Sequence, residues 1–238
     1  AYRHHPDEVA NNLARVKTGL LRVGIPKRAD DPLTERLLRD AGKELGGLFD
    51  DAHGGFGDGP KFPTVPPLNF MLRRSASPGD ESLPRKVLFQ LRTMAAGGIY
   101  DHLGGGFHRY SVDGQWMVPH FEKMLYDNAQ LVRVYLDGWR LTKEERFRRV
   151  VEDTLEYVRR ELTHQDGAFF AAQDADSEGR EGAFFVWDQA ELIAILGAEL
   201  GGEFCRAYGV TESGNFDGKT VLHRLGRPEI SDDEAEQA

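Results

Sequence analysis

Apolar residues recur every three or four positions over most of the chain, which predicts a mainly helical protein. The first such segment, 6–23, places five apolar residues on one helical face behind Pro6, a residue suited to the first turn of a helix. The same spacing continues in segments 33–48, about 68–73, about 81–96, 120–141, 143–162, 189–196 and 199–208. Asp30 and Asp31 are candidate caps for the second segment.

Glycine-rich stretches separate these predicted helices. The run from Gly54 to Gly59 is followed by four prolines and cannot continue a helix. A second break starts at Tyr100, with the sequence "YDHLGGGFHRYSVDGQW". The segment "DGAFFAAQDADSEGREGAFFVW" is typical of two short aromatic strands joined by an acidic turn.

The glycine-rich stretches also form a repeat. The sequences "HGGFGDG", "LGGGFHRY" and "QDGAFFAA" each follow a pair of helical segments, at spacings of about 50 to 60 residues, and each has glycine before phenylalanine. We expect a toroid of paired helices whose loops gather at one end and form a cleft. The alternative is a helical solenoid in which these loops are simple connectors.

Composition narrows the class of protein. The 238 residues carry 30 Lys and Arg against 39 Asp and Glu, a net charge of -9, which argues against nucleic acid or an anionic membrane as the main partner. No apolar run approaches the roughly 20 residues of a membrane span. The lone Cys205 excludes an internal disulfide and a zinc site built on paired cysteines. We therefore expect a soluble, cytoplasmic protein, with an acidic flexible tail over 229–238.

Four stretches carry a resemblance to a known family: "GPKFPTVPPLNFML", "GGIYDHLGGGFHRYSVDGQWMVPHFEKMLYDNAQL", "QDADSEGREGAFFVWDQAEL" and "GNFDGKTVLHRL". Over Asp50 to Leu225 the chain resembles the bacterial YyaL and mammalian spermatogenesis-associated group of thioredoxin-domain-containing proteins. The resemblance implies a thioredoxin-like domain followed by an (α/α)6 barrel of the six-hairpin glycosidase type. That barrel is similar to N-acylglucosamine 2-epimerase and cellobiose epimerase.

The resemblance also implies a division of the chain. Residues 1–29 would be a linker helix after a thioredoxin-like domain that this chain lacks, and residues 30–228 would supply about three or four of six hairpins. Such a partial barrel exposes an apolar edge, which a second copy of the chain would cover. The expected partners are thus a sugar or sugar derivative, the thioredoxin-like domain and a homo-oligomer.

Histidines beside the glycine-rich loops are the candidates for chemistry. In epimerases of this barrel type, the resemblance implies two histidines that act as general base and acid on a carbon next to a carbonyl, and imidazole titrates near neutral pH. His102 and His120 are the candidates for this role, while His53 and His108 are candidates for substrate binding. The alternative for each is a histidine that caps a helix or bonds a loop carbonyl.

Residues after His120 extend this candidate site. If the helix starts at His120, its face continues through Met124 and Asp127, and Glu122 and Asp127 are placed to orient a histidine or to bind sugar hydroxyls. For Lys123 with Asp127 we favour a surface ion pair. Asn128 falls in the apolar stripe, where burial requires a hydrogen-bond partner, and it is also a candidate substrate ligand.

A second mechanism needs two carboxylates. Asp101 with Asp174 or Asp176 would act as in a glycoside hydrolase, where the carboxyl groups lie ~5 Å or ~6.5–9.5 Å apart. Trp116 and Tyr110 are candidates for a platform under a sugar ring, whereas Phe107 and Phe121 are expected in the core. Arg109 would bind an anionic substituent. A third alternative is a barrel that binds a ligand or partner and catalyses nothing.

We expect no metal and no cofactor. "DADSEG" begins like a calcium loop, but the twelfth position is Phe185 instead of glutamate. A zinc site made from His102, His108 and His120 is conceivable but not favoured. "GGFGDG" has neither the spacing of a dinucleotide-binding fingerprint nor the ending of a P-loop.

Overall fold

The computed structural model describes residues 6–23, 34–77 and 80–227. The chain divides into two units, Ala1–Leu38 and Arg39–Ala238. The first holds α1 (Pro6–Val23), a helix with the bounds that the sequence predicted. Among the side chains described there, none of α1 is buried. The candidate caps Asp30 and Asp31 and the predicted tail 229–238 lie outside the described residues, and the expected domain boundary at residue 30 stays a prediction.

The second unit is a set of helices that confirms the mainly helical prediction. Its helices run in the order α2 (Glu35–Leu48, which begins in the first unit), α3 (Val65–Arg73), a 3-10 turn at Arg74–Ala76, α4 (Ser82–Ala96), α5 (Leu125–Thr142), α6 (Glu145–Glu161), α7 (Gln189–Leu196) and α8 (Ala198–Tyr208). Helix α3 starts three residues before the predicted one. Pro66 and Pro67 fall in its first turn, where a missing N–H breaks no helical hydrogen bond.

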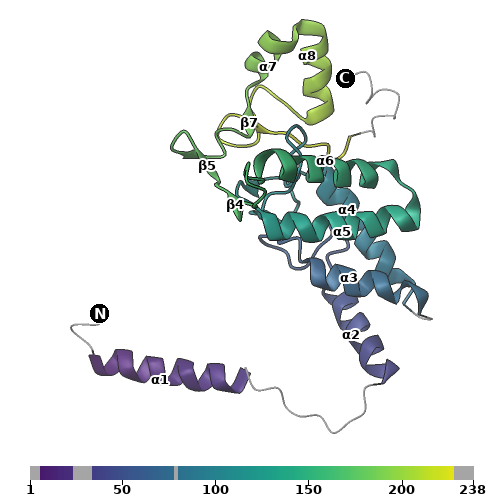
Figure 1. Cartoon of the computed structure of the whole chain (residues 1–238), viewed down its shortest axis with the longest axis vertical. Helices are drawn as coiled ribbons and strands as arrows, with labels where there is room; N and C mark the ends of the chain where they lie inside the picture. Colours follow the sequence, from purple (N-terminus) through teal and green to yellow (C-terminus); the bar gives the residue numbers. More distant parts are fainter. Residues whose placement is uncertain (1–5, 24–33, 78–79, 228–238) are drawn as a thin grey trace. The chain divides into compact units, whose positions relative to one another are not determined.

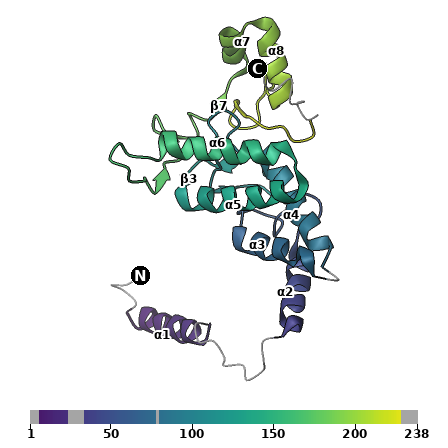
Figure 2. The same ribbon diagram turned by 45° about the vertical axis from the view of Figure 1, so that its right-hand side comes forward.

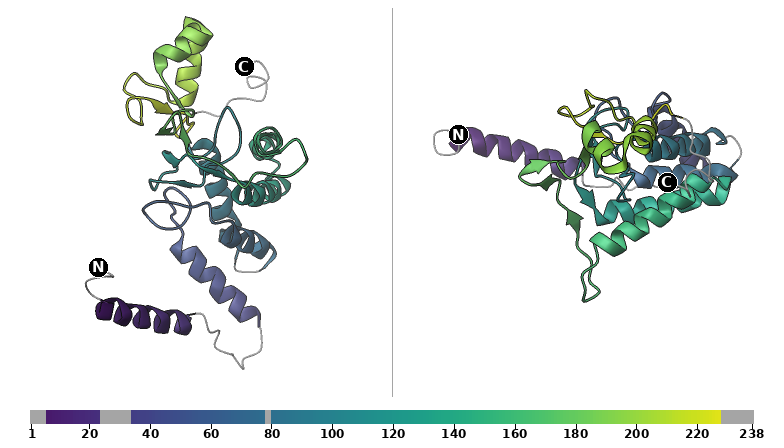
Figure 3. Two further views of the ribbon diagram at one scale, coloured as in Figure 1. Left: turned by 60° about the vertical axis from the view of Figure 1, so that its left-hand side comes forward. Right: turned by 90° about the horizontal axis from the view of Figure 1, so that it is seen from above.

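Helices α5 and α6 lie side by side, and α3 and α4 pack against them (Figure 1 and Figure 2). The core between these four helices is apolar and closely packed, with fully buried side chains that include Leu68, Met71, Leu91, Met94, Leu131, Tyr135 and Phe147. Helices α7 and α8 pack on each other around a smaller cluster that contains Leu192 and Cys205 (Figure 3).

Within the described loops, eight strands of two residues each form four antiparallel pairs. They are β1 (Tyr110–Ser111) with β2 (Pro119–His120), β3 (Lys123–Met124) with β4 (Ala172–Gln173), β5 (Asp176–Ser177) with β6 (Arg180–Glu181), and β7 (Val186–Trp187) with β8 (Thr220–Val221). The segment predicted to hold two short strands does contain β4 and β7, but these strands do not pair with each other. The acidic residues between them form their own hairpin, and the flanking segments pair with distant strands instead.

The predicted start of the helix at His120 is also wrong. His120 pairs with Tyr110 in β2, and Lys123 pairs with Gln173 in β3, so the backbone remains extended until α5 begins at Leu125. Backbone groups that are engaged in strand pairing are not available for helical hydrogen bonds. The expected helical face from His120 through Met124 to Asp127 therefore does not form, and Lys123 does not lie one helical turn before Asp127.

The glycine repeat predicted from the sequence produces two loops of the same structure, which we call the Asp–Lys loops. In each, an aspartate starts the loop and its carboxylate accepts two backbone N–H groups of the following turn, from Ala52 and His53 at Asp50 and from Leu103 and Gly104 at Asp101. The backbone of each aspartate is bonded to the glycine pair that follows, Gly54–Gly55 or Gly105–Gly106.

A buried lysine closes each loop. Lys61 donates to Asp50 and to the Gly54 carbonyl, and Lys123 donates to Asp101 and to the Gly105 carbonyl. Both ammonium groups also lie over an aromatic ring, that of Trp116 or that of Tyr157. The third predicted repeat, at Gly167, has a Thr163–Phe169 backbone bridge but a different residue at the aspartate position.

The rings of Trp116 and Tyr157 explain why the second residue of each glycine pair has to be glycine. Gly55 and Gly106 have φ of +86° and +78°, and a Cβ atom on either would lie 2.6 Å from the ring of Trp116 or Tyr157. Only glycine combines that backbone conformation with so close an approach. The Asp–Lys loop is thus a five-part unit of aspartate, two glycines, lysine and covering ring.

Candidate functional site

The segment from His120 to Lys123 presents different side chains to its two sides. His120 and Glu122 are partly exposed, whereas Phe121 and Lys123 are fully buried. This alternation follows from the extended backbone, in which successive side chains point to opposite faces. Two groups of functional side chains result, and they share this one segment of chain.

The first group surrounds His120, and we call it the His120 cluster: Arg109, Tyr110, His120, Glu122, Asp127 and Glu181. Nδ1 of His120 lies 2.7 Å from Oε1 of Glu181, on the neighbouring β5–β6 hairpin, and donates a hydrogen bond to it. Nε2 lies 3.8 Å from Oε2 of Glu122. A carboxylate on Nδ1 fixes the tautomer, so Nε2 is the nitrogen that can accept a proton.

Aromatic rings support His120 from one side. Its imidazole stacks on Tyr110 with the ring centroids 5.1 Å apart, and Tyr110 stacks on Phe62 at 4.7 Å. Phe62 is exposed. The three rings form a continuous apolar surface beside the charged groups of the cluster.

Asp127, in the first turn of α5, has an unusual protonation equilibrium. The pKa of Asp127 is raised to about 6, because burial outweighs the opposing charge of Arg109 and the nearby Glu122 adds to the effect of burial. Nη1 of Arg109 is 2.9 Å from Oε2 of Glu122. The cluster therefore holds an oriented imidazole and a carboxyl group that titrates near neutral pH, which are the two components of acid–base catalysis.

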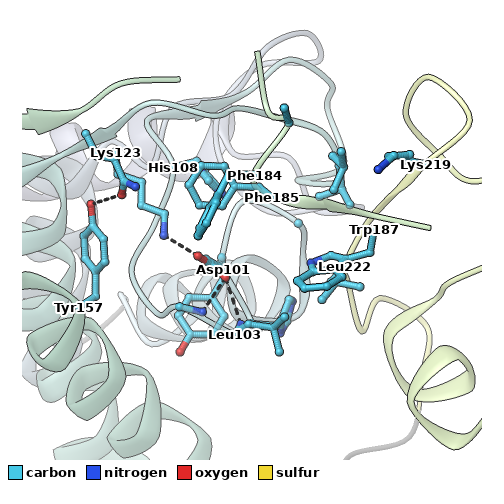
Figure 4. A pocket seen from close by; sticks show the side chains of 18 of the residues that line it. Asp101, Leu103, His108, Lys123, Tyr157, Phe184, Phe185, Trp187, Lys219 and Leu222 are labelled. Atoms are coloured by element: carbon cyan, nitrogen blue, oxygen red, sulfur yellow. Dashed lines mark hydrogen bonds and ion pairs between the residues drawn. The ribbon is translucent and has the colours of Figure 1, made fainter. Parts of the chain in front are cut away.

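The second group lines a cavity of about 600 Å³, which we call the Asp101 pocket. Figure 4 shows its base, where Nζ of Lys123 is 2.7 Å from Oδ2 of Asp101. The same ammonium is 4.3 Å from the ring centroid of Tyr157 and 4.9 Å from that of Phe185. The hydroxyl of Tyr157 donates to Gln173 at 2.9 Å.

Burial and charge set the protonation states in this pocket. Burial raises the pKa of Asp101, but Lys123, His108 and the turn N–H groups outweigh it and hold that pKa below its usual range. Burial lowers the pKa of Lys123, and Asp101 opposes that shift. The pair is thus an aspartate carboxylate bonded to a buried ammonium.

The two histidines of the pocket are neutral at physiological pH. Burial lowers the pKa of His108 to about 3, with Lys123 adding to the shift, and its Nδ1 donates to the Phe121 carbonyl at 2.9 Å. Burial lowers the pKa of His102 to about 4, and its Nε2 donates to the Gly97 carbonyl at 3.0 Å. The ring of His102 contacts the rings of Tyr100 and Tyr208 edge-on.

Trp116 and His53, two further site residues predicted from the sequence, lie outside both the His120 cluster and the Asp101 pocket. Trp116, expected in the cleft, is fully buried in the core, where it covers Gly55 and donates to the His53 carbonyl at 3.1 Å. That prediction is wrong because the first Asp–Lys loop needs this ring. His53 itself is exposed, 3.4 Å from Asp50, and lines a separate cavity of about 550 Å³ together with Asp58 and Gln115.

Asn128 confirms the expected need for a partner. It is fully buried, accepts from the Phe107 N–H at 2.7 Å and donates to the Phe107 and Met124 carbonyls. Phe107 and Phe121 are fully buried, as predicted. Asp174 and Asp176 are exposed, Asp174 just before β5 and Asp176 as its first residue, and the Asp174 carboxylate accepts from the Asp176 N–H at 3.1 Å.

Sequence reasoning missed Lys123 and Glu181. Lys123 was expected in a surface ion pair with Asp127, but it is buried against Asp101, since the extended segment turns its side chain inward. The duplicated aspartate and glycine pair, each followed by a lysine, was the signal in the sequence.

In the described part of the chain, no group of three or more His, Cys, Asp or Glu side chains is arranged to hold a metal ion. None of the described helices has both the length and the apolar composition that a membrane crossing requires.

Comparison with solved structures places the fold among (α/α) barrels. Cellobiose 2-epimerase from Bacillus thermoamylovorans superposes on 59% of this chain and 42% of its own chain, with a TM-score of 0.50 and 15% sequence identity, a likeness that concerns the fold alone. The paired-helix toroid predicted from the sequence is thereby confirmed.

By sequence, the chain is homologous to spermatogenesis-associated protein 20. It is 36% identical to the human protein over 237 residues, which cover 90% of this chain and 30% of that protein. It is 35% identical to the rat protein over 238 residues, with 91% and 30% covered. The chain thus spans about 30% of the length of these relatives, and the family resemblance is confirmed. No family model matches the chain. The thioredoxin-like domain stays a prediction.

Proposed function

We propose that this chain is part of a carbohydrate-active barrel that moves a proton on a carbon next to a sugar carbonyl, as an epimerase or isomerase does, and that His120 is its acid–base residue. The observation that carries the proposal is the 2.7 Å contact of His120 Nδ1 with Glu181. It is supported by Asp127, a carboxyl group whose pKa is raised to about 6 and which interacts with Glu122, 3.8 Å from Nε2 of His120. The cellobiose 2-epimerase fold supports the substrate class.

In this reaction Nε2 of His120 accepts the proton from the carbon next to the carbonyl, and Glu181 stabilises the imidazolium that forms. Asp127, protonated below about pH 6, donates its proton to the carbonyl oxygen and gives an enediol. His120 then gives its proton to the former carbonyl carbon while Asp127 takes up the proton of the other enediol hydroxyl, which yields the isomeric keto sugar. Epimerisation follows instead when a second acid on the opposite face protonates the original carbon and Asp127 takes back its own proton. Phe62, the exposed end of this stack, offers its ring surface to the apolar face of the sugar.

His102 is poorly placed to act as the base. Nε2 of His102 is engaged by the Gly97 carbonyl, and a pKa of about 4 makes its imidazole a weak base at neutral pH. The paired-aspartate hydrolase is less favoured, because a general acid needs a raised pKa, whereas the pKa of Asp101 is lowered.

The test is exchange of the sugar C2 proton in deuterated water, followed by NMR with cellobiose, mannose and N-acetylglucosamine. We expect exchange in the wild type and a fall of about 100- to 10,000-fold in His120→Gln. Glu181→Gln should slow exchange at unchanged sugar affinity. The control is His164→Gln, an exposed histidine 3.3 Å from Asp166, which should exchange normally.

Two results would contradict the proposal. Exchange that persists in His120→Gln would assign the base to another residue. Sugar binding in the wild type without any exchange would favour a barrel that binds a ligand and catalyses nothing. The thioredoxin-like partner and a homo-oligomer through an exposed edge remain predictions.

A further inference from the structure

The Asp101 pocket has no role in the proton transfer proposed above. Among the residues that the structure describes, none of the six in the His120 cluster lines it. Its volume of about 600 Å³ lies within the range of about 300–1,000 Å³ of small-molecule sites. The cavity therefore needs an explanation of its own.

Charged side chains around the pocket balance. Its lining holds four cations and four carboxylates: Lys123, Arg160, Arg180 and Lys219 against Asp101, Glu161, Glu178 and Glu191. Lys123 is bonded to Asp101, Arg160 to Glu161, and Lys219 lies 3.9 Å from Glu191. Burial keeps His102 and His108 neutral. A lining without excess charge does not favour an anion or a cation.

Apolar surface alternates with these polar groups. Phe184 is 70% exposed and Trp187 is half-buried, and both line the pocket together with Leu103 and Leu222 (Figure 4). Large aromatic side chains in contact with water beside many hydrogen-bonding groups suit a ligand that has an apolar face and a hydroxylated edge. A saccharide has both.

From these features we infer that the Asp101 pocket is a second binding site, for an uncharged saccharide, distinct from the His120 cluster. The inference does not depend on catalysis at His120. The two sites lie back to back. Arg180 lines the pocket, and the next residue in β6, Glu181, holds His120.

Tryptophan fluorescence tests the inference, since only three tryptophans are present and one of them lines the pocket. The probe is cellobiose, with glucose 6-phosphate as the charged comparison. We expect a saturable change of emission with cellobiose in the wild type and in His120→Gln, and none in Trp187→Phe. Trp139→Phe is the matched control and should respond as the wild type does, because Trp139 lies on α5 outside the pocket.

Phe184→Ala provides a second variant, and its exposed position makes loss of folding an unimportant concern. It should weaken cellobiose binding by about two- to tenfold. The inference is overturned if folded wild type shows no saturable change with cellobiose, if the change persists in Trp187→Phe but is lost in His120→Gln, or if only glucose 6-phosphate binds. Failure of deuterium exchange with a normal Trp187 response would reject the proposed function alone.

Discussion

At the scale of single residues, protonation depends on what surrounds each side chain and not on its type. Asp101 and Asp127 are both partly buried aspartates, yet the pKa of the first is lowered and that of the second is raised to about 6. The difference is a buried ammonium: Lys123 bonds Asp101, whereas Asp127 has Glu122 close by and Arg109 only as a partial counterweight.

The raised pKa of Asp127 predicts how Asp127→Asn changes stability with pH. A carboxyl group whose pKa is higher in the folded state favours folding when it is protonated, and this contribution is lost as pH rises through about 6. At pH 4 the wild type and the neutral variant should melt at similar temperatures. At pH 8 the variant should melt higher, as measured by circular dichroism. An equal Tm difference at both values would show that Asp127 titrates normally.

At the scale of elements, the Asp–Lys loops explain which charges support the fold. Each lysine is buried and reaches its aspartate from a later segment. Removing one partner leaves an uncompensated buried charge, which costs about 3–5 kcal/mol. The two loops make this prediction testable twice in one chain.

We therefore expect Lys123→Met and Lys61→Met each to lower the free energy of unfolding by about 3–5 kcal/mol. Asp101→Asn added to Lys123→Met should recover part of the loss, because the unpaired carboxylate is then gone. Urea denaturation of the wild type, Lys123→Met, Asp101→Asn and the double variant measures this coupling, and Lys61→Met repeats the single loss in the other loop. The prediction would be contradicted by losses in the free energy of unfolding below about 1 kcal/mol, or by strictly additive effects of Lys123→Met and Asp101→Asn in the double variant.

The elements also show what the sequence could reveal. Long amphipathic helices such as α1 and α6 were predicted within two residues, because their apolar period is strong. The pairing of the two-residue strands was missed, since partners lie as many as 50 positions apart, as for Lys123 and Gln173 in β3 and β4. Because these strands were missed, His120 was placed at the start of a helix instead of in β2. Its contact with Glu181 was missed as well, since the two residues lie far apart in the sequence.

At the scale of the whole molecule, buried neutral histidines make the fold sensitive to acid. The pKa values of His102 and His108 lie at about 4 and about 3, below the usual 6.5, so only the unfolded chain takes up these protons between those values and pH 6.5. The contribution of each to stability is complete above pH 6.5 and is lost as pH falls, at up to about 1.4 kcal/mol per pH unit for each histidine.

The free energy of unfolding should therefore decrease between pH 6.5 and pH 4.5, a window above the range in which most carboxylates titrate. Urea midpoints at three pH values measure the slope. The Asp127→Asn background removes the opposing contribution of that carboxyl group. His108→Gln should flatten the slope, and an unchanged slope in this variant would mean that His108 is protonated in the folded protein.

The duplication of the Asp–Lys loop also bears on the order in which the chain folds. Lys61 follows Asp50 by 11 residues, whereas Lys123 follows Asp101 by 22. Each doubling of the number of residues in a loop adds about 0.6 kcal/mol to the entropic cost of closing it, so the first Asp–Lys loop closes at the smaller cost. On a growing chain it is also synthesised first. The ring that covers it, Trp116, lies between Asp101 and Lys123 of the second Asp–Lys loop in the sequence. The first Asp–Lys loop therefore stays open to water until the second has begun to form.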